Sequence, residues 1–252
     1  MRTRWIQTAS ILLGLLCGAA VAADRPITMP LLSVRPYGWL DAQGQPQGLY
    51  PDIAAALARE TGLEIRIDMV PFARAAALVA GGNADATLMF TTAVTEKKAV
   101  QAVVVFYTDQ VVMLRSGVSA ASRVDLAPLS LGRMIGGCQE LVNDPSANWR
   151  FFDVASQESG LRMLLASRLD GFCSASEALT DAVASAGLES SFRTVQRVVL
   201  ATKPVWLQLS PSLPQDLAER LVKGVRQLQK SGEMARIFRR RLGDNYQLNL
   251  PK

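Results

Sequence analysis

The segment Ala84–Lys98, ADATLMFTTAVTEKK, joins an apolar run directly to a cluster of threonines and lysines. ADATLMF has the composition of a buried strand, and Thr95 followed by Glu96 is typical of a helix start, in which the hydroxyl caps free amides. In open α/β sheets, ligands bind beyond the carboxyl ends of the strands. The junction therefore indicates either a strand that ends at a binding site or an ordinary strand-to-helix turn.

The segments before this junction alternate between strand and helix patterns. ITMPLLSV (27–34) and LEIRIDMV (63–70) have the composition of strands, whereas PDIAAALARETG (51–62) and FARAAALVAGG (72–82) have helical periodicity and end in glycine. A β-α-β-α-β order is typical of an open parallel sheet with helices on its faces. The first part of the chain is therefore predicted to form an α/β lobe.

The same alternation returns later in the chain and predicts a second α/β lobe. Its strands are expected at 129–137, 151–156 and 170–175, and its helices at 157–168 and 176–187. Extended stretches near 111–116 and 197–203 are expected to connect the lobes. Helices at 214–232 and 233–243 follow, and the apolar stripe Leu217, Leu221, Val225 and Leu228 predicts that they complete the core of the first lobe.

Residues 1–23 have the pattern of a secretory signal peptide, with a basic start, a short apolar core and the small residues AAVAA. The apolar core is too short to span a bilayer. Cys17 follows the bulky Leu16 rather than a small residue, so lipidation of Cys17 is not expected. We expect a soluble, exported protein.

Composition excludes several classes of function. Of the 252 residues, 49% are hydrophobic and 19% are charged, which is typical of a globular protein, and none is histidine. The lack of histidine excludes Ser-His-Asp and Cys-His catalysis, and no phosphate loop or metal-binding cysteine motif is present, so we expect no cofactor and no metal. The basic run ARIFRRRLG near the C-terminus reads as a solvated helix face, and no nucleic-acid partner is expected.

Two cysteines remain after removal of the signal peptide, Cys138 and Cys173. In an oxidising compartment an even number of cysteines favours a disulfide. Two small buried apolar residues are the alternative, and the sequence leaves both open.

Segments along nearly the whole mature chain together resemble the family 3 extracellular solute-binding proteins, the periplasmic receptors of polar amino-acid ABC importers. The resemblance is carried by PYGWLDAQGQPQGLYPDIAAALARETG (36–62), LVAGGNADATLMF (78–90), TEKK (95–98), FYTDQVVMLRSG (106–117), SQESGLRMLLASRLDGF (156–172) and LVKGVRQLQKSGEMARIFRRRLG (221–243). It implies a periplasmic-binding-protein-like II fold, in which two α/β lobes joined by two crossover strands enclose a ligand cleft. Lobe 1 would comprise residues 24–113 and 201–252, and lobe 2 residues 114–200.

The resemblance also implies a periplasmic location, a small-molecule solute, the membrane component of an ABC transporter as partner, a monomer and no catalysis. Two departures concern the ligand. Lys98 stands where the family's amino-acid receptors place an arginine that clamps the carboxylate, and Ala175 stands where they place an acid for the ammonium, with Glu177 two positions on. A lysine attracts an anion as a point charge, so a small polar and anionic solute is expected rather than an α-amino acid.

The expected ligand-binding residues fall into four groups: aromatic side chains that could stack on the solute, two cations, the two threonines after the strand at 84–90, and polar residues of lobe 2. They are Tyr37, Trp39, Phe72, Arg74, Thr91, Thr92, Lys98, Gly137, Gln139 and Glu177. Core packing for the aromatic residues, a surface position for Arg74 and a plain tight turn at Gly137 are the alternatives. Two other functions remain open: a sensor subunit or periplasmic dehydrogenase partner, and an enzyme resembling cyclohexadienyl dehydratase with Glu140 or Glu177 as its acid.

Overall fold

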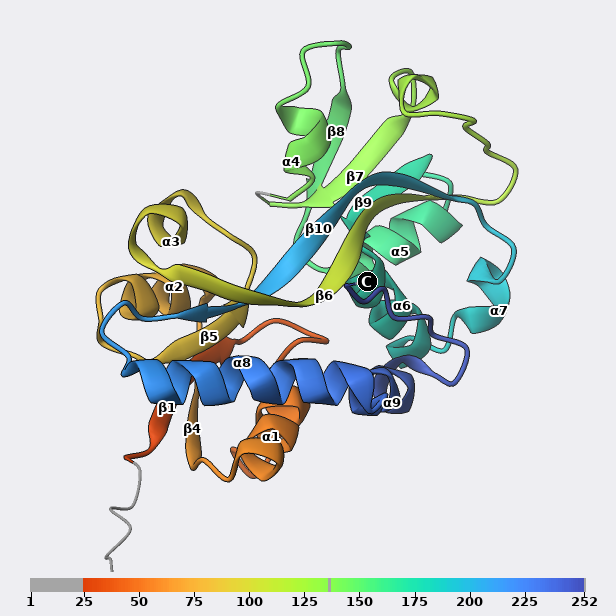
Figure 1. Cartoon of the computed structure of the whole chain (residues 1–252). Helices are drawn as coiled ribbons and strands as arrows, with labels where there is room; N and C mark the ends of the chain where they lie inside the picture. Colours follow the sequence, from red (N-terminus) through yellow and green to blue (C-terminus); the bar gives the residue numbers. More distant parts are fainter. Residues whose placement is uncertain (1–24, 136, 252) are drawn as a thin grey trace, which may run out of the picture.

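The computed structural model describes residues 25–135 and 137–251. The expected signal peptide, residues 1–23, and Cys17 lie outside the described residues. The chain forms two α/β lobes joined by two long strands (Figure 1). Within the described ranges, no helix combines the length and the apolar character needed to cross a membrane.

Lobe 1 is assembled from both ends of the chain. Its elements are β1 (Ile27–Leu32), β2 (Trp39–Leu40), β3 (Pro46–Gln47), α1 (Leu49–Thr61), β4 (Ile65–Val70), α2 (Phe72–Ala80), β5 (Ala86–Met89), α3 (Ala93–Lys98), α8 (Gln215–Lys230) and α9 (Glu233–Leu242). The apolar stripe of α8 is buried against α1 in one continuous core, as its spacing predicts. At Gly224 an added Cβ would lie 2.6 Å from Leu57, so the missing side chain allows the two helices to approach closely.

Lobe 2 is continuous in sequence and has a core on each face of its sheet. Its elements are a 3-10 turn (Val124–Leu126), β7 (Ser130–Met134), α4 (Gln139–Val142), β8 (Arg150–Val154), α5 (Gln157–Leu165), β9 (Gly171–Ala175), α6 (Ser176–Ser185) and α7 (Glu189–Phe192). Strand β7 pairs in parallel with β8 on one side and with β9 on the other. One core cluster lies with α5 and α6, and the other contains the two cysteines.

The connections between the lobes are longer than the sequence predicted. Strands β6 (Val100–Leu114) and β10 (Arg197–Leu209) pair antiparallel along nearly their whole lengths. Strand β5 joins β10 at the lobe 1 end and β9 joins β6 at the lobe 2 end, so a single six-stranded sheet runs through both lobes. These are the two crossover strands expected near 111–116 and 197–203, and they extend beyond those stretches because the valine-rich start of β6 and the end of β10 also pair as strands.

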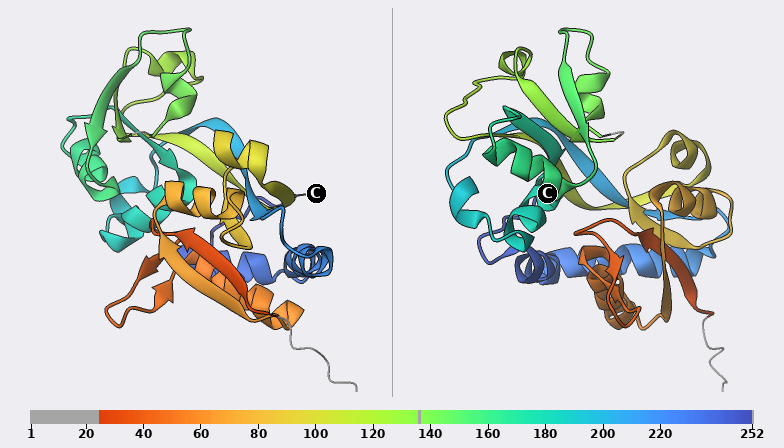
Figure 2. Two further views of the ribbon diagram at one scale, coloured as in Figure 1. Left: turned by 90° about the vertical axis from the view of Figure 1, so that its left-hand side faces the viewer. Right: turned by 180° about the vertical axis from the view of Figure 1, so that it is seen from behind.

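A C-terminal tail, residues 243–251, follows α9 and pairs with β6, a path that no local sequence pattern predicted. The Tyr107 amide donates a hydrogen bond of 2.8 Å to the Asn249 carbonyl. The Tyr246 ring stacks on Phe238 of α9 with 5.8 Å between ring centroids. Figures 1 and 2 show this tail, in dark blue, leaving α9 of lobe 1 and running towards β6, with which Asn249 pairs.

Candidate functional site

The opening junction forms the edge of lobe 1 after β5. Thr92 is the N-cap of α3: its hydroxyl accepts from the Thr95 amide at 3.1 Å, and the Thr95 hydroxyl accepts from the Thr92 amide at 2.9 Å. The sequence placed the cap at Thr95, three residues too late, because Thr95 supplies the second half of this reciprocal pair. Thr91 is exposed just before the cap, so its hydroxyl is available at the edge while the Thr92 hydroxyl serves the helix.

Lys98 and Arg74 are exposed cations on this side of lobe 1. Lys98 is the last residue of α3 and Arg74 lies in the first turn of α2, and these two helices contact each other. Among residues 25–135 and 137–251, neither side chain has a hydrogen-bond or ion-pair partner. Two solvated cations without a carboxylate partner are available to an external anion.

The three predicted aromatic residues have different environments. Tyr37 is 6% exposed, and its ring packs at 5.1 Å from that of Tyr50 in the lobe 1 core. Trp39 is half-buried in β2, where the Arg35 guanidinium lies 3.9 Å from its ring centroid. Phe72 is 38% exposed at the start of α2. A free stacking surface is therefore offered by Phe72 rather than by Tyr37 or Trp39.

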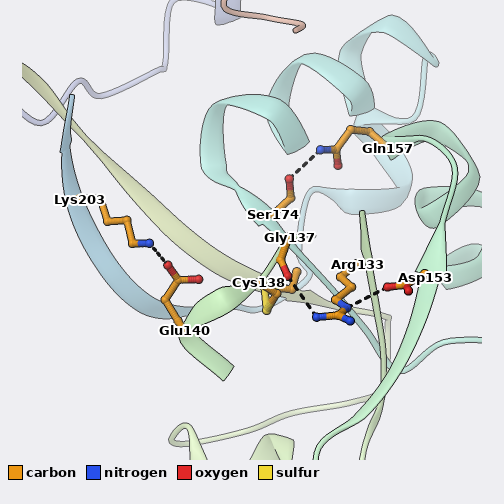
Figure 3. Close-up of a disulfide and its surroundings, with 9 residues drawn as sticks. Arg133, Gly137, Cys138, Glu140, Asp153, Gln157, Ser174 and Lys203 are labelled. Carbon is orange, nitrogen blue, oxygen red and sulfur yellow. Dashed lines mark hydrogen bonds and ion pairs between the residues drawn. A yellow bond between two sulfur atoms is a disulfide. The ribbon is translucent and has the colours of Figure 1, made fainter. Parts of the chain in front are cut away.

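A disulfide fixes the facing edge of lobe 2 (Figure 3). Cys138 and Cys173 are bonded, with 5.9 Å between their Cα atoms. Cys138 is the N-cap of the short helix α4 and has a left-handed backbone, φ 58°, which is uncommon outside glycine. Because Cys173 lies within β9, the bond holds the segment after β7 against the neighbouring region of the sheet.

Polar groups around this disulfide are paired with one another. The Gly137 carbonyl accepts from Arg133 at 3.4 Å, and Arg133 also bonds Asp153 at 2.8 Å. Glu140 of α4 forms an ion pair with Lys203 of β10 (Figure 3). Gln139 is exposed at the start of α4. Glu140 is thus committed to a structural pair and is not a free acid.

Glu177 is the most buried charged residue of the candidate set, at 1% exposed. One carboxylate oxygen, Oε2, accepts from Thr108 of β6 and from Tyr37 of lobe 1 at 3.3 Å, and Oε1 accepts from Tyr246 of the tail at 2.6 Å. Burial raises the pKa of the Glu177 carboxyl, and the hydroxyl donors lower it in part. Both oxygens are occupied, so Glu177 ties the lobes, the crossover and the tail together instead of presenting a free acid.

A cavity of about 480 Å³ lies between the lobes, lined by Arg35 of lobe 1 and by residues of β7, α5 and α6 of lobe 2. Asp181 of α6 lies in this lining and accepts no hydrogen bond from the described residues. Burial raises the pKa of Asp181, and the charge of Arg35 lowers it. None of the sequence-predicted residues lines the cavity. Sequence analysis missed Asp181, and its position one helical turn after Glu177 on α6 is the local signal that could have drawn attention to it.

Comparison with known proteins identifies the family. Residues 31–244 match the bacterial extracellular solute-binding proteins, family 3. A comparison with curated protein sequences finds no match. Among solved structures, the probable amino-acid ABC transporter extracellular-binding protein ytmK from Bacillus subtilis has a TM-score of 0.70 at 16% identity, covering 88% of this chain and 99% of that one.

Two further structures show the range of proteins that share the fold. A histidine kinase sensor domain with similarity to periplasmic binding proteins has a TM-score of 0.68 at 16% identity, covering 91% of this chain and 99% of that one. An ancestral amino-acid-binding protein, a precursor of cyclohexadienyl dehydratase, has a TM-score of 0.63 at 16% identity, with 86% and 95% covered. At such identities these structures show the fold alone. The match over residues 31–244 shows that the chain belongs to the bacterial extracellular solute-binding proteins of family 3.

Proposed function

We propose that this chain is a periplasmic, non-enzymatic receptor that captures a small organic anion between its lobes and delivers it to an ABC importer. The observation that carries the proposal is the pair of exposed, unpartnered cations Lys98 and Arg74 on the lobe 1 edge. The hydroxyl of Thr91 adds a neutral donor beside them. Closure of two lobes over a solute is the hinge mechanism that such folds use.

The positions of the acids favour anions over α-amino acids. Ala175 has no charge, and Glu177 is buried with both oxygens occupied, so neither is free to bind an α-ammonium on this side of the lobes. An ammonium without a partner in a closed cleft would cost several kcal/mol of desolvation. Asp181 is an acid without a hydrogen-bond donor among the described residues. It lines the interlobe cavity together with Arg35, whose positive charge already acts on it.

The same acids argue against catalysis. An enzyme that protonates a leaving hydroxyl needs an acid in reach of the substrate. Glu140 is paired with Lys203, and Glu177 is enclosed by three hydroxyl groups. Both acids that the sequence offered for a dehydratase therefore have structural partners, and binding without reaction is the better-supported function.

Calorimetry with matched ligands tests this proposal. Glutarate and succinate should bind more tightly than glutamate and aspartate, which differ from them by the α-ammonium. Lys98→Met should weaken anion binding by about 1–3 kcal/mol, the scale of a hydrogen bond to a charged group. Lys97→Met, one position away on the same short helix, is the matched control and should leave the affinity unchanged. Tight binding of a neutral or cationic amino acid that Lys98→Met does not affect would refute the proposal.

A further inference from the structure

A second cavity, of about 370 Å³, lies on the tail side of the crossover strands, and we call it the hinge cavity. Its lining comes from β6, the first turns of α6, the start of β10, the end of α9 and the C-terminal tail, and it includes Asp109, Ser176, Glu177, Thr180, Arg197 and Tyr246. Its volume lies within the range of small-molecule sites. None of the residues assigned above to solute capture lines it except Glu177, whose oxygens are already occupied.

Arg197 supplies a positive charge in the lining of the hinge cavity. Its guanidinium makes two long hydrogen bonds, of 3.4 Å to the Ser176 hydroxyl and 3.3 Å to the Thr180 hydroxyl. It has no carboxylate ion pair within residues 25–135 and 137–251. The surrounding protein displaces enough water to lower the pKa of Arg197. A ligand carboxylate would accept the remaining donors of the guanidinium fork, which suits that planar geometry.

Asp109 supplies a negative charge in the same lining. Its Oδ1 atom accepts from the Thr202 hydroxyl at 2.5 Å, while Oδ2 has no donor among the described residues. An ammonium group can occupy that open position. The charge of Asp109 raises the pKa of Tyr246 and the charge of Arg197 lowers it, so both charged groups lie within electrostatic range of the same hydroxyl.

The strand register indicates how far apart the two charges lie. Asp109 is opposite Thr202 and Arg197 is opposite Met113, so the two backbone positions differ by four residues along β6, or roughly 13 Å. The hydrogen bonds of Arg197 to Ser176 and Thr180 direct its side chain towards the Asp109 end of β6, because Ala175, next to Ser176, is opposite Gln110. A ligand that bridges them needs its carboxylate and ammonium farther apart than they are in an α-amino acid.

We propose that the hinge cavity is a second binding site, which takes a small zwitterion with its carboxylate on Arg197 and its ammonium on Asp109. The site is independent of the solute-capture role. Its floor is Glu177, which also holds Tyr37 of lobe 1 and Thr108 of the crossover. A ligand bound there contacts lobe 2, both crossover strands and the tail at once. Occupancy therefore favours the arrangement of the lobes described here and acts as an effector of solute binding.

A titration with 4-aminobutyrate, butyrate and butylamine tests the charge requirement, because the three compounds share a four-carbon body. We expect saturable binding of 4-aminobutyrate and at least tenfold weaker binding of the other two. Arg197→Gln and Asp109→Asn should each weaken 4-aminobutyrate binding at least tenfold. Arg193→Gln, an exposed arginine outside the lining, is the matched control and should leave this binding unchanged.

Urea unfolding of each variant verifies that it is folded. Thr180→Val, which removes one of the hydroxyls that hold Arg197, replaces Arg197→Gln if the latter does not fold. Three results would overturn the proposal: no binding of 4-aminobutyrate up to about 10 mM, where even weak sites are detected; equal binding of butyrate; or no change in the Arg197 and Asp109 variants. Loss of binding in Lys98→Met with no loss in the hinge variants would also overturn it and place the ligand in the proposed solute site.

Discussion

The two lobes offer one another different polar surfaces. On lobe 1, Lys98 and Arg74 are exposed and have no partner in the described parts of the chain. On lobe 2, the corresponding edge is covalently fixed by Cys138 and Cys173, and Glu140 is paired with Lys203. Under the proposed function the two edges have different roles: the lobe 1 edge carries charges that a ligand can use, and the disulfide edge of lobe 2 supplies a rigid surface on which Glu140 is already paired. Substitutions at the disulfide edge of lobe 2 should therefore change stability, and those at the lobe 1 edge should change affinity for the solute.

The largest effect is expected from removing the disulfide. Cys138 and Cys173 are separated by 35 residues, and a crosslink closing a loop of this size stabilises a protein by about 3–4 kcal/mol through the unfolded state. The double variant Cys138→Ser, Cys173→Ser should have a free energy of unfolding lower by that amount in urea. The reduced wild-type protein should have nearly the same free energy of unfolding as the double variant. Affinity for the solute should change much less. A large loss of affinity with unchanged stability would reverse the roles assigned to the lobes.

The ion pair between α4 and β10 should have the next largest effect. The Glu140 side chain is 9% exposed and that of Lys203 is 41% exposed, so Lys203→Met leaves a nearly buried carboxylate without its partner. We expect a loss of about 1–2 kcal/mol of unfolding free energy, below the cost for a fully buried pair because Lys203 is partly solvated. Adding Glu140→Gln should restore most of it. Recovery by the second substitution distinguishes loss of the pair from a general packing defect.

Glu177 should make the stability of the protein depend on pH. Burial raises its pKa in the folded state, so the folded state holds the proton more tightly than the unfolded state, whose carboxyl titrates near pH 4.3. Stability is therefore fully retained below about pH 4.3 and falls as pH rises through the folded pKa, with a slope of at most about 1.4 kcal/mol per pH unit. Glu177→Gln should remove this part of the decline, whereas Glu189→Gln, at an exposed position, should not. Parallel pH profiles of wild type and Glu177→Gln would contradict it.

How much the sequence predicted depends on how local each feature is. The strand and helix segments, including the buried stripe of α8, were predicted because apolar periodicity is a property of neighbouring residues. The contact of Tyr37 with Glu177 joins positions 140 residues apart, and nothing in the local pattern identifies it. Glu177 was therefore expected at the ligand, whereas its position beneath the tail and beside β6 makes it a buried acceptor for three hydroxyl groups.

The tail and the crossovers show the same limit. Residues 243–251 have no regular periodicity, so the stacking of Tyr246 on Phe238 and its bond to Glu177 follow only from the three-dimensional arrangement. The lengths of β6 and β10 depend on their pairing with each other, and this pairing cannot be predicted from the residue pattern of either strand alone. In contrast, Lys98 was singled out because the resembled family places an arginine there, and Arg74 because it is a lone charge in an alanine-rich helix start. Neither has a partner in the described structure, and their role at the ligand stays a prediction.

The smallest expected effect distinguishes whether the two lobe 1 cations act on one ligand. Arg74→Gln should weaken binding of glutarate by about 0.5–1 kcal/mol, because an exposed charge contributes modestly, and it should leave unfolding unchanged. If Lys98 and Arg74 hold the same anion, the double variant should lose a different amount from the sum of the single losses, since residues that share a partner are not independent. Lys223→Gln, an exposed cation on α8, is the control for net charge. If calorimetry shows additive losses, Arg74 acts only through the overall electrostatic potential of lobe 1 and does not contact the anion. In that case a higher salt concentration should remove the effect of Arg74→Gln but not the effect of Lys98→Met.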